Sequence, residues 1–198
     1  MIEYDLIQLC GLDEDGEALD LRQREVLSAL AEDADAIYTF QGLRRKLGLH
    51  QEMLSRTLER LEEQNLIERT GDGYRIGANK DEFQFGYGAE ATLIETQVVT
   101  AHLPSRVNVE LTLNTLKGRW FHEFRWLAYS ETASGLILRW ITEDGRIQLR
   151  ASISQGVLSI SALYKSSMDE ERATRSALEI FDFIVRQNTF PMKHENLN

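Results

Sequence analysis

Hydrophobic residues recur at helical spacing three times between residues 20 and 64, which predicts three short helices. Asp20 and Gln23 form a capping-box pattern at the start of the first helix, and Thr39 is a suitable N-cap for the second. Gly48 ends the second helix, because glycine readily adopts the left-handed conformation of a helix terminus. The predicted helices cover residues 21–32, 40–47 and 51–64, the third has Leu54, Leu58 and Leu61 on one face, and residues 33–38 are expected to form a loop.

Two short runs of strand-forming residues follow the third predicted helix, at residues 66–69 and 73–76. The glycine and aspartate residues between them suit a tight hairpin turn. The order is therefore helix, helix, short turn, helix and hairpin within about sixty residues. This order is typical of a winged helix-turn-helix.

The amino-acid sequence of this segment, and not only the order of its elements, matches a known pattern. RRKLGLHQEMLSRTLERLEEQNLIERTGDGYRI resembles the helix-turn-helix and wing of the MarR, ArsR and Lrp-like regulators of bacteria and archaea. In those families a small helix ends in Leu-Gly-Leu, and the recognition helix carries Ser-Arg-x-Leu-x-x-Leu, here Ser55 to Leu61. The resemblance covers residues 21–78 and implies a bacterial or archaeal transcription regulator that binds double-stranded DNA.

The sequence pattern of the rest of the chain predicts an antiparallel sheet with two helices. Strands are expected at residues 92–103, 120–130, 136–142, 147–154 and 157–164. Residues 107–116 fit a strand by their alternation and a helix by their apolar stripe, and Ser105, a usable N-cap, favours the helix. The last helix opens at the capping-box pattern Ser167–Glu170 and has Ala173, Ala177, Phe181 and Ile184 on one side.

The predicted fold class is therefore α+β: a winged helix-turn-helix followed by an antiparallel-sheet domain of order β-α-β-β-β-β-α. That order is similar to one half of a TATA-binding-protein-like fold, and only the order of the elements carries this similarity. The expected organisation is an acidic N-terminal segment (1–20), the winged helix-turn-helix (21–78), a linker (79–91), a dimerisation or sensing domain (92–190) and a tail (191–198).

Net charge first argues against nucleic-acid binding, because the formal net charge is −10 and affinity for phosphates depends on Lys and Arg. Residues 1–20 carry seven acids and no base, whereas residues 21–79 carry nine bases and ten acids. The predicted DNA-binding segment is therefore close to neutral, and net charge does not exclude DNA binding.

The candidate DNA-binding residues lie on the second and third helices and on the hairpin. An Arg pairs with guanine and a Gln with adenine in the major groove, each good pair being worth about 1–3 kcal/mol of discrimination. Acidic residues on the third helix and at the hairpin turn lower the expected affinity. The candidates are Arg44, Arg45, Gln51, Glu52, Ser55, Arg56, Arg60, Arg69 and Arg75.

No catalytic, metal or cofactor motif is found in the sequence. The four histidines are scattered without metal-ligand spacing, and GDGYRIG is part of the hairpin and not a dinucleotide-binding loop. We therefore expect no enzyme activity, no catalytic residue, no cofactor and no metal. Cys10 has no partner for a disulfide, and no leader or membrane-spanning run is present, so we expect a cytoplasmic protein that does not bind a membrane.

The segment from Lys117 to Tyr129 is rich in aromatic and basic residues. The favoured interpretation is a sheet core with one half-exposed face. The alternative is a ligand or partner surface made of Trp120, His122, Phe124 and Trp126, with Trp140 on the next strand.

The sequence thus predicts a homodimeric, DNA-binding transcription regulator whose C-terminal domain dimerises or senses a small-molecule or protein effector. The alternative is a protein-interaction module in a replication, transcription or chromosome assembly. A weaker alternative makes the C-terminal sheet a small-molecule carrier.

Overall fold

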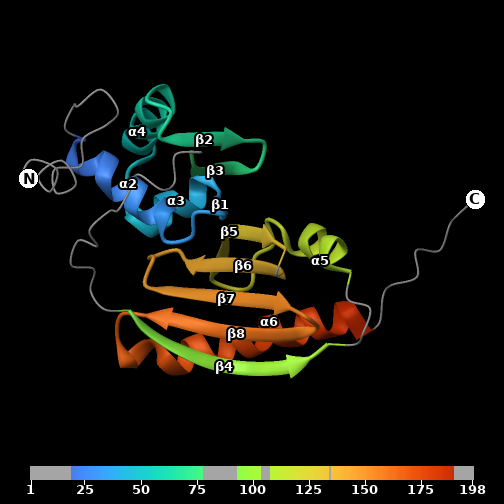
Figure 1. The fold of residues 1–198 in the computed structure, drawn as a ribbon. Helices are drawn as coiled ribbons and strands as arrows, with labels where there is room; N and C mark the ends of the chain where they lie inside the picture. The colour runs from blue at the N-terminus through green and yellow to red at the C-terminus, as the bar shows by residue number, and fades with distance from the viewer. Residues whose placement is uncertain (1–18, 78–92, 104–107, 134, 190–198) are drawn as a thin grey trace, which may run out of the picture. The chain divides into compact units, whose positions relative to one another are not determined.

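The computed structural model describes residues 19–77, 93–103, 108–133 and 135–189 (Figure 1). The fold is mixed α and β with antiparallel strands, so the predicted α+β class is confirmed. The chain divides into two compact units. The first contains the chain up to Thr92 together with Leu127–Ser130, and the second contains Leu93–Trp126 and the rest of the chain from Glu131. The predicted linker and C-terminal tail, and most of the predicted acidic segment, lie outside the described residues.

The first unit contains the predicted three helices and hairpin, each with bounds within one residue of the expected ones. Asp20 and Gln23 form the predicted capping box, and Gly48 ends the second helix with φ +64°. The described elements are α2 (Leu21–Ala31), β1 (Ile37–Tyr38), α3 (Phe40–Leu47), α4 (Gln51–Glu63), β2 (Ile67–Thr70) and β3 (Gly73–Ile76).

Strand β1 corrects the expectation of a simple loop at residues 33–38. Tyr38 pairs with Tyr74 of β3, and β1 also pairs antiparallel with residues of Leu127–Ser130, which belong to β5 (Phe124–Thr132). Within this unit the strand order is β2-β3-β1-β5. Two residues are too short a run for alternation to reveal a strand, so only the long-range pairing defines it.

Helix α3 lies very close to this segment of β5. A Cβ atom at Gly42 would be 2.6 Å from the backbone oxygen of Leu127, so only glycine fits there. The backbone N–H and the hydroxyl of Thr39 both donate hydrogen bonds to the same oxygen. The core of the unit is formed by the buried faces of the helices, including Val26, Leu27, Leu30, Leu43, Leu54, Leu58 and Leu61.

The second unit follows the predicted order β-α-β-β-β-β-α. Its elements, with β5 shared between the units, are β4 (Ile94–His102), α5 (Val109–Leu116), β5, β6 (Gly135–Thr142), β7 (Ile147–Ser154), β8 (Val157–Tyr164), the 3₁₀ turn η2 (Ser167–Asp169) and α6 (Glu170–Thr189). Strands β6, β7, β8 and β4 are neighbours in that order, and β4 ends it.

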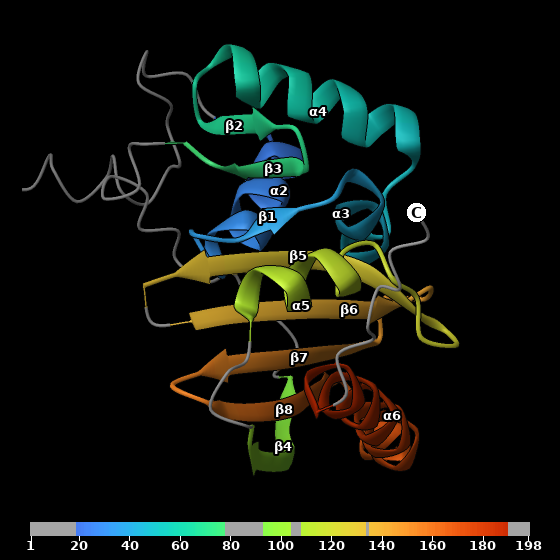
Figure 2. The ribbon, with the colours of Figure 1, turned by 90° about the vertical axis from the view of Figure 1, so that its right-hand side faces the viewer.

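Strands β7 and β8 of the second unit have one buried and one half-exposed face, whereas Arg139 and Ile141 on the corresponding face of β6 are also buried. Trp140, Leu149 and Ala162 lie opposite one another on β6, β7 and β8 and are buried, whereas Gln148 and Arg150 on the other face of β7 are half-exposed. Helix α6 packs against β8, β7 and β4, and α5 packs against β6 and α6 (Figure 2). The alternation that predicted these strands thus separates core from solvent.

The starts of two helices and of one strand differ from expectation. Residues 109–116 are helical, as the apolar stripe favoured, but the N-cap is Asn108, and Ser105 lies outside the described residues. Helix α6 follows η2, which Ser166 caps, so the predicted capping box at Ser167–Glu170 is not the one that forms. The third difference is in β5, which begins at Phe124 and not at Trp120.

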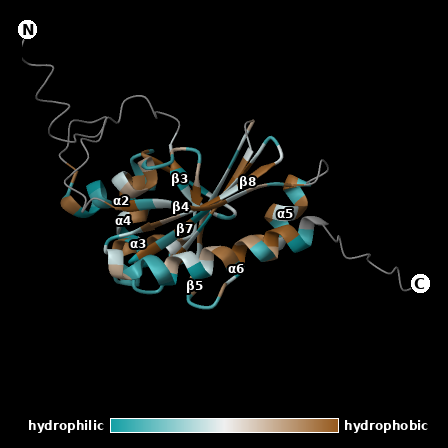
Figure 3. Cartoon of the chain, turned by 90° about the horizontal axis from the view of Figure 1, so that it is seen from below, coloured by the Kyte–Doolittle hydropathy of each residue, from teal (hydrophilic) through white to brown (hydrophobic). Residues whose placement is uncertain are grey.

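The hydrophobic stripe of α6 is nearly the predicted one. Ala173, Ala177 and Ile184 are fully buried, but Ile180 takes the inward position expected for Phe181, which is half-buried. The alternation of hydrophobic and hydrophilic residues along this helix is visible in Figure 3. None of the described helices is both long and apolar enough to cross a membrane.

Candidate nucleic-acid interface

Helix α4 has one buried and one exposed face. Leu54, Leu58 and Leu61 are buried, with Thr57 beside them. The Thr57 hydroxyl donates a hydrogen bond to the carbonyl of Met53, one turn earlier. The candidate residues Gln51, Glu52, Arg56 and Arg60 are exposed, and Ser55 is half-exposed. The sequence spacing therefore brings five of the nine candidates onto one solvent-facing surface.

Charge is unevenly distributed along this surface. The N-terminal half of α4 has Glu52 and Arg56, whereas the C-terminal half has Arg60 and the three exposed acids Glu59, Glu62 and Glu63. The positive end of the helix dipole also lies at the N-terminus. The N-terminal half is therefore the end of α4 that suits a polyanion.

The two arginines of α4 have acidic neighbours. Arg56 Nη2 lies 2.5 Å from Glu52 Oε1, one turn earlier, with both side chains at least 70% exposed. Arg60 Nη1 lies 3.6 Å from Asp20 Oδ2, at the N-cap of α2. Exposed helical pairs contribute only about 0.3–0.5 kcal/mol, which is less than the about 1–3 kcal/mol of a good base contact. These ion pairs therefore do not prevent the arginines from binding another group.

The basic residues of α3 lie in its last turn, just before α4. Arg44 and Arg45 are half-exposed, and Arg45 donates to the carbonyl of Gln41. The Lys46 side chain is only 8% exposed, and its ammonium lies 2.7 Å from Glu32. Lys46 thus joins α3 to the end of α2, and Arg44 and Arg45 are the bases of this helix that face solvent.

The two arginines of the hairpin lie on opposite faces. Glu68 pairs with Arg75, and Arg69 with Tyr74, in consecutive positions of the β2–β3 register. Arg75 Nε and Nη2 both donate to Glu68, at 2.8 and 2.6 Å, and the Arg69 guanidinium lies 5.9 Å from the centre of the Tyr74 ring. Because successive side chains of a strand alternate, a duplex lying on one face of the hairpin meets only one of these arginines.

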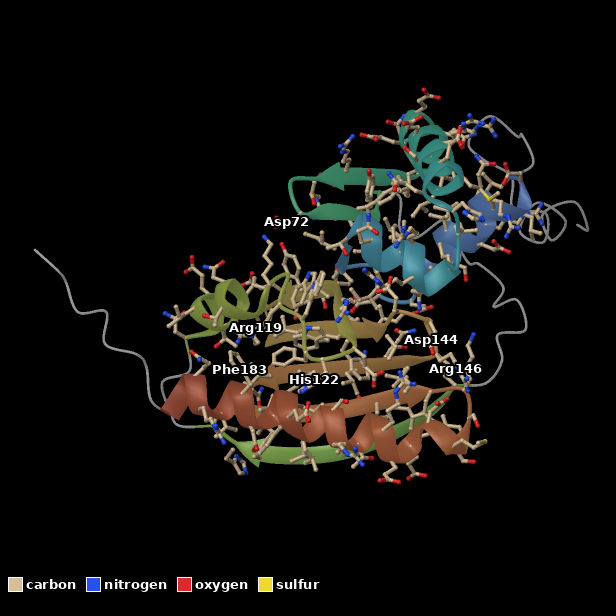
Figure 4. The ribbon with its side chains drawn as sticks, turned by 180° about the vertical axis from the view of Figure 1, so that it is seen from behind. Asp72, Arg119, His122, Asp144, Arg146 and Phe183 are labelled. Atoms are coloured by element: carbon tan, nitrogen blue, oxygen red, sulfur yellow. The ribbon has the colours of Figure 1, made fainter. Side chains whose placement is uncertain are left out.

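A hydrogen bond that the sequence analysis did not predict holds the hairpin turn. The Tyr129 hydroxyl donates a 2.8 Å hydrogen bond to Asp72 Oδ2, and Tyr129 belongs to the part of β5 in the first unit. Asp72 lies in the turn of the hairpin (Figure 4). No local pattern in the sequence links residues so far apart along the chain.

His50 is the second residue that the sequence reasoning did not select. It is the exposed N-cap of α4, and its side chain makes no capping hydrogen bond to the first turn. Its position immediately before Gln51, the first residue of the predicted third helix, was the feature of the sequence that could have identified it. His50 adds an exposed imidazole ring to the N-terminal end of the candidate surface.

The aromatic residues of the second candidate surface are separated by the structure. Phe124, Trp126 and Trp140 are buried, and the rings of Trp126 and Trp140 meet edge to face at 5.4 Å, so the core interpretation holds for them. Trp120 is 62% exposed and His122 is exposed, in the segment before β5. These five residues therefore do not form one continuous surface.

The segment from Arg119 to Glu123 packs along α6. The Arg119 guanidinium lies 4.0 Å from the centre of the Phe183 ring, and His122 Nδ1 lies 2.9 Å from Glu179 Oε2 (Figure 4). Glu123 accepts hydrogen bonds from Arg172 through both carboxylate oxygens. His122 has φ +50°, so a left-handed residue interrupts the extended run predicted from Trp120.

Charged groups near this segment shift one another's pKa values. The hydrogen bond from Arg172 lowers the pKa of Glu123 below its ordinary value, against the opposing effect of burial. Burial by itself raises the pKa of Asp144, but hydrogen bonds from Thr142 and from the backbone N–H of Arg146 outweigh it and lower the pKa. The Arg172–Glu123 contact joins the loop before β5 to α6, whereas the contacts of Asp144 stabilise the β6–β7 turn itself.

Among the described residues, no group of three or more His, Cys, Asp or Glu side chains is arranged to hold a metal ion. Comparison of the chain with protein-family models, with curated proteins and with solved structures finds no match.

Proposed function

We propose that this protein is a DNA-binding transcription regulator, in which residues 21–78 act as a winged helix-turn-helix and α4 is the recognition helix. The observation that carries the proposal is the exposed N-terminal half of α4, which presents Gln51, Glu52 and Arg56 after the short turn 48–50 that follows the half-exposed Arg44 and Arg45 of α3. The order of α2, β1, α3, α4, β2 and β3 supports it.

The charge distribution indicates how α4 meets the duplex. The N-terminal half enters the major groove, where Arg56 and Gln51 reach base edges and the last turn of α3 contacts phosphates. The exposed Glu59, Glu62 and Glu63 would be repelled by phosphates, so the C-terminal half points away from the duplex. The hairpin adds one arginine at most, since Arg69 and Arg75 lie on opposite faces.

A symmetric dimer is part of the proposal. A single site with few basic side chains binds phosphates weakly. Two linked sites that bind one duplex raise the apparent affinity without any new contact. The second unit supplies dimerisation or responds to an effector. Native mass spectrometry of the full chain tests this part, and a mass of one chain at all concentrations would contradict it.

A protein-interaction module is the second candidate, favoured by the acidity of α4. This helix has four acids and two bases, so its C-terminal half suits a basic protein surface better than DNA. The two candidates differ in their dependence on salt and on Arg56.

The test measures binding of the full chain to random-sequence duplex DNA from about 50 to 200 mM salt. A regulator loses affinity steeply over this range, and Arg56→Gln lowers affinity for the preferred sequence by at least about fivefold. No detectable binding at about 50 mM salt would contradict DNA binding and favour a protein partner.

The chain offers a closely matched control for Arg56. Arg175 on α6 pairs with Glu171 one turn earlier at 2.9 Å, and its side chain is 71% exposed. Arg175→Gln removes the same charge and the same kind of helical pair. We expect it to leave DNA affinity unchanged, and an equal loss in both variants would show an effect of net charge alone.

A further inference from the structure

We propose that Glu52 and Arg56 act as one unit that reads a G·C base pair in the major groove. This base readout rests on the DNA binding proposed above, and it adds the base preference of the recognition helix. The observation that carries it is the direct contact between the two side chains. Arg56 Nη2 donates to Glu52 Oε1 at 2.5 Å, on the exposed face of α4.

The contact favours one orientation of the Arg56 guanidinium while leaving donors available. An arginine side chain has five N–H donors, and the hydrogen bond to Glu52 uses one edge of the guanidinium. The remaining N–H groups match the two acceptors of guanine, N7 and O6. Glu52 therefore orients the guanidinium before the base is bound, which reduces the entropy lost on binding.

Glu52 also has a recognition role of its own. A carboxylate only accepts hydrogen bonds, and Oε2 is the oxygen not engaged by the bond to Arg56. Cytosine presents a single N4 amino donor in the major groove, directly beside the O6 of its paired guanine. The two donors of Arg56 and the acceptor of Glu52 thus match the sequence of acceptor, acceptor and donor along a G·C pair.

The same arrangement discriminates against the other pairs. Thymine O4 is an acceptor and repels a carboxylate, and the adenine N6 amino group opposes the donors of Arg56. Glu52 therefore lowers general affinity for phosphates but raises the difference between the correct and incorrect base pair. This explains the presence of an exposed acid in the half of α4 that faces the duplex.

The experiment selects binding sites from a randomised duplex pool with the wild-type full chain, Glu52→Gln and Arg175→Gln. We expect the wild-type sites to share a G·C pair, and its replacement by A·T to lower affinity about tenfold. Glu52→Gln should bind random duplexes at least as tightly as wild type, because an acid is removed. It should have a weaker G·C preference than wild type, because Arg56 loses the partner that orients it and glutamine also pairs with adenine.

Each result separates the base readout from DNA binding itself. Sites that share no G·C pair, or a base preference unchanged in Glu52→Gln, would overturn the base readout and leave DNA binding intact. Failure of the wild type to bind any duplex at about 50 mM salt would overturn both. Arg175→Gln should select the same sites as wild type, and far-UV circular dichroism of each variant confirms that it is folded.

Discussion

The exposed arginines of α4 and the hairpin are paired differently from those around the loop before β5, although each unit also has a pair of the other kind, Arg60 with Asp20 in the first and Arg175 with Glu171 in the second. In the first unit, Arg56 and Arg75 pair with acids on their own helix or hairpin. In the second unit, Arg172 and Arg146 join different elements, Arg172 through Glu123 of the loop before β5 and Arg146 through Asp169 of η2. A local pair constrains little of the fold, and when exposed it leaves donors of its arginine accessible to a ligand. A pair between elements links parts of the fold, so the locally paired Arg56 and Arg75 are better candidates for binding than Arg172 and Arg146.

The largest effect is expected where the second unit combines such contacts with its aromatic core. Trp140 is fully buried and its Nε1–H donates a 3.0 Å hydrogen bond to the carbonyl of Arg119. Trp140→Phe removes this donor and leaves a cavity, so we expect a loss of about 2–4 kcal/mol in the free energy of unfolding.

Urea unfolding followed by tryptophan fluorescence measures this loss. All three tryptophans of the chain, Trp120, Trp126 and Trp140, belong to the second unit, so the signal reports on that unit. A loss below about 1 kcal/mol would mean that the surface ion pairs, and not the core, hold the loop before β5.

An intermediate effect is expected from two arginines on α6. Arg172 joins α6 to Glu123, whereas Arg175, three residues further on, pairs within the helix. Arg172→Gln should cost about 1 kcal/mol and Arg175→Gln less than about 0.5 kcal/mol at neutral pH. Equal losses would contradict the distinction between contacts within and between elements.

The sign of the pH dependence follows from the lowered pKa of Glu123. Its ordinary pKa is 4.5, and the folded value is lower. The folded state therefore gains stability from this group above the unfolded pKa, and the gain is lost as the pH falls through the folded value. The difference between wild type and Arg172→Gln should shrink below pH 4.5, and fluorescence-detected unfolding at several pH values checks it.

The smallest effect is expected at Arg56. Its pair with Glu52 is local and exposed, so Arg56→Gln should change the free energy of unfolding of the first unit by less than about 0.5 kcal/mol. Amide hydrogen exchange of α4 measures this directly. A loss above about 1 kcal/mol would show that Arg56 supports the fold, so any loss of DNA binding in the variant would need a structural explanation.

Local patterns predicted the elements of both units well. The capping box at Asp20, the terminating Gly48 and the turn before Gly73 each depend on residues within three or four positions of one another. Strands β7 and β8 were predicted to the residue, because one face of each is buried and the other half-exposed. Five candidate residues on α4 share a surface for the same reason.

The failures share a different cause. Strand β1 was expected to be a loop, and β5 was expected to begin at Trp120. Each outcome depends on a partner far away in the sequence, such as the residues of β5 that pair with β1. Neither periodicity nor composition records which distant segment is the partner.

The sequence by itself therefore determined where helices and strands lie and which face of each is apolar, because these follow from backbone preferences and from burial at fixed periods. Only the tertiary structure decided that Leu127–Ser130 joins the first unit, that Tyr129 holds Asp72, and which acid each arginine meets. Those contacts are set by packing and hydrogen bonding between distant segments, which take their geometry only from the folded chain.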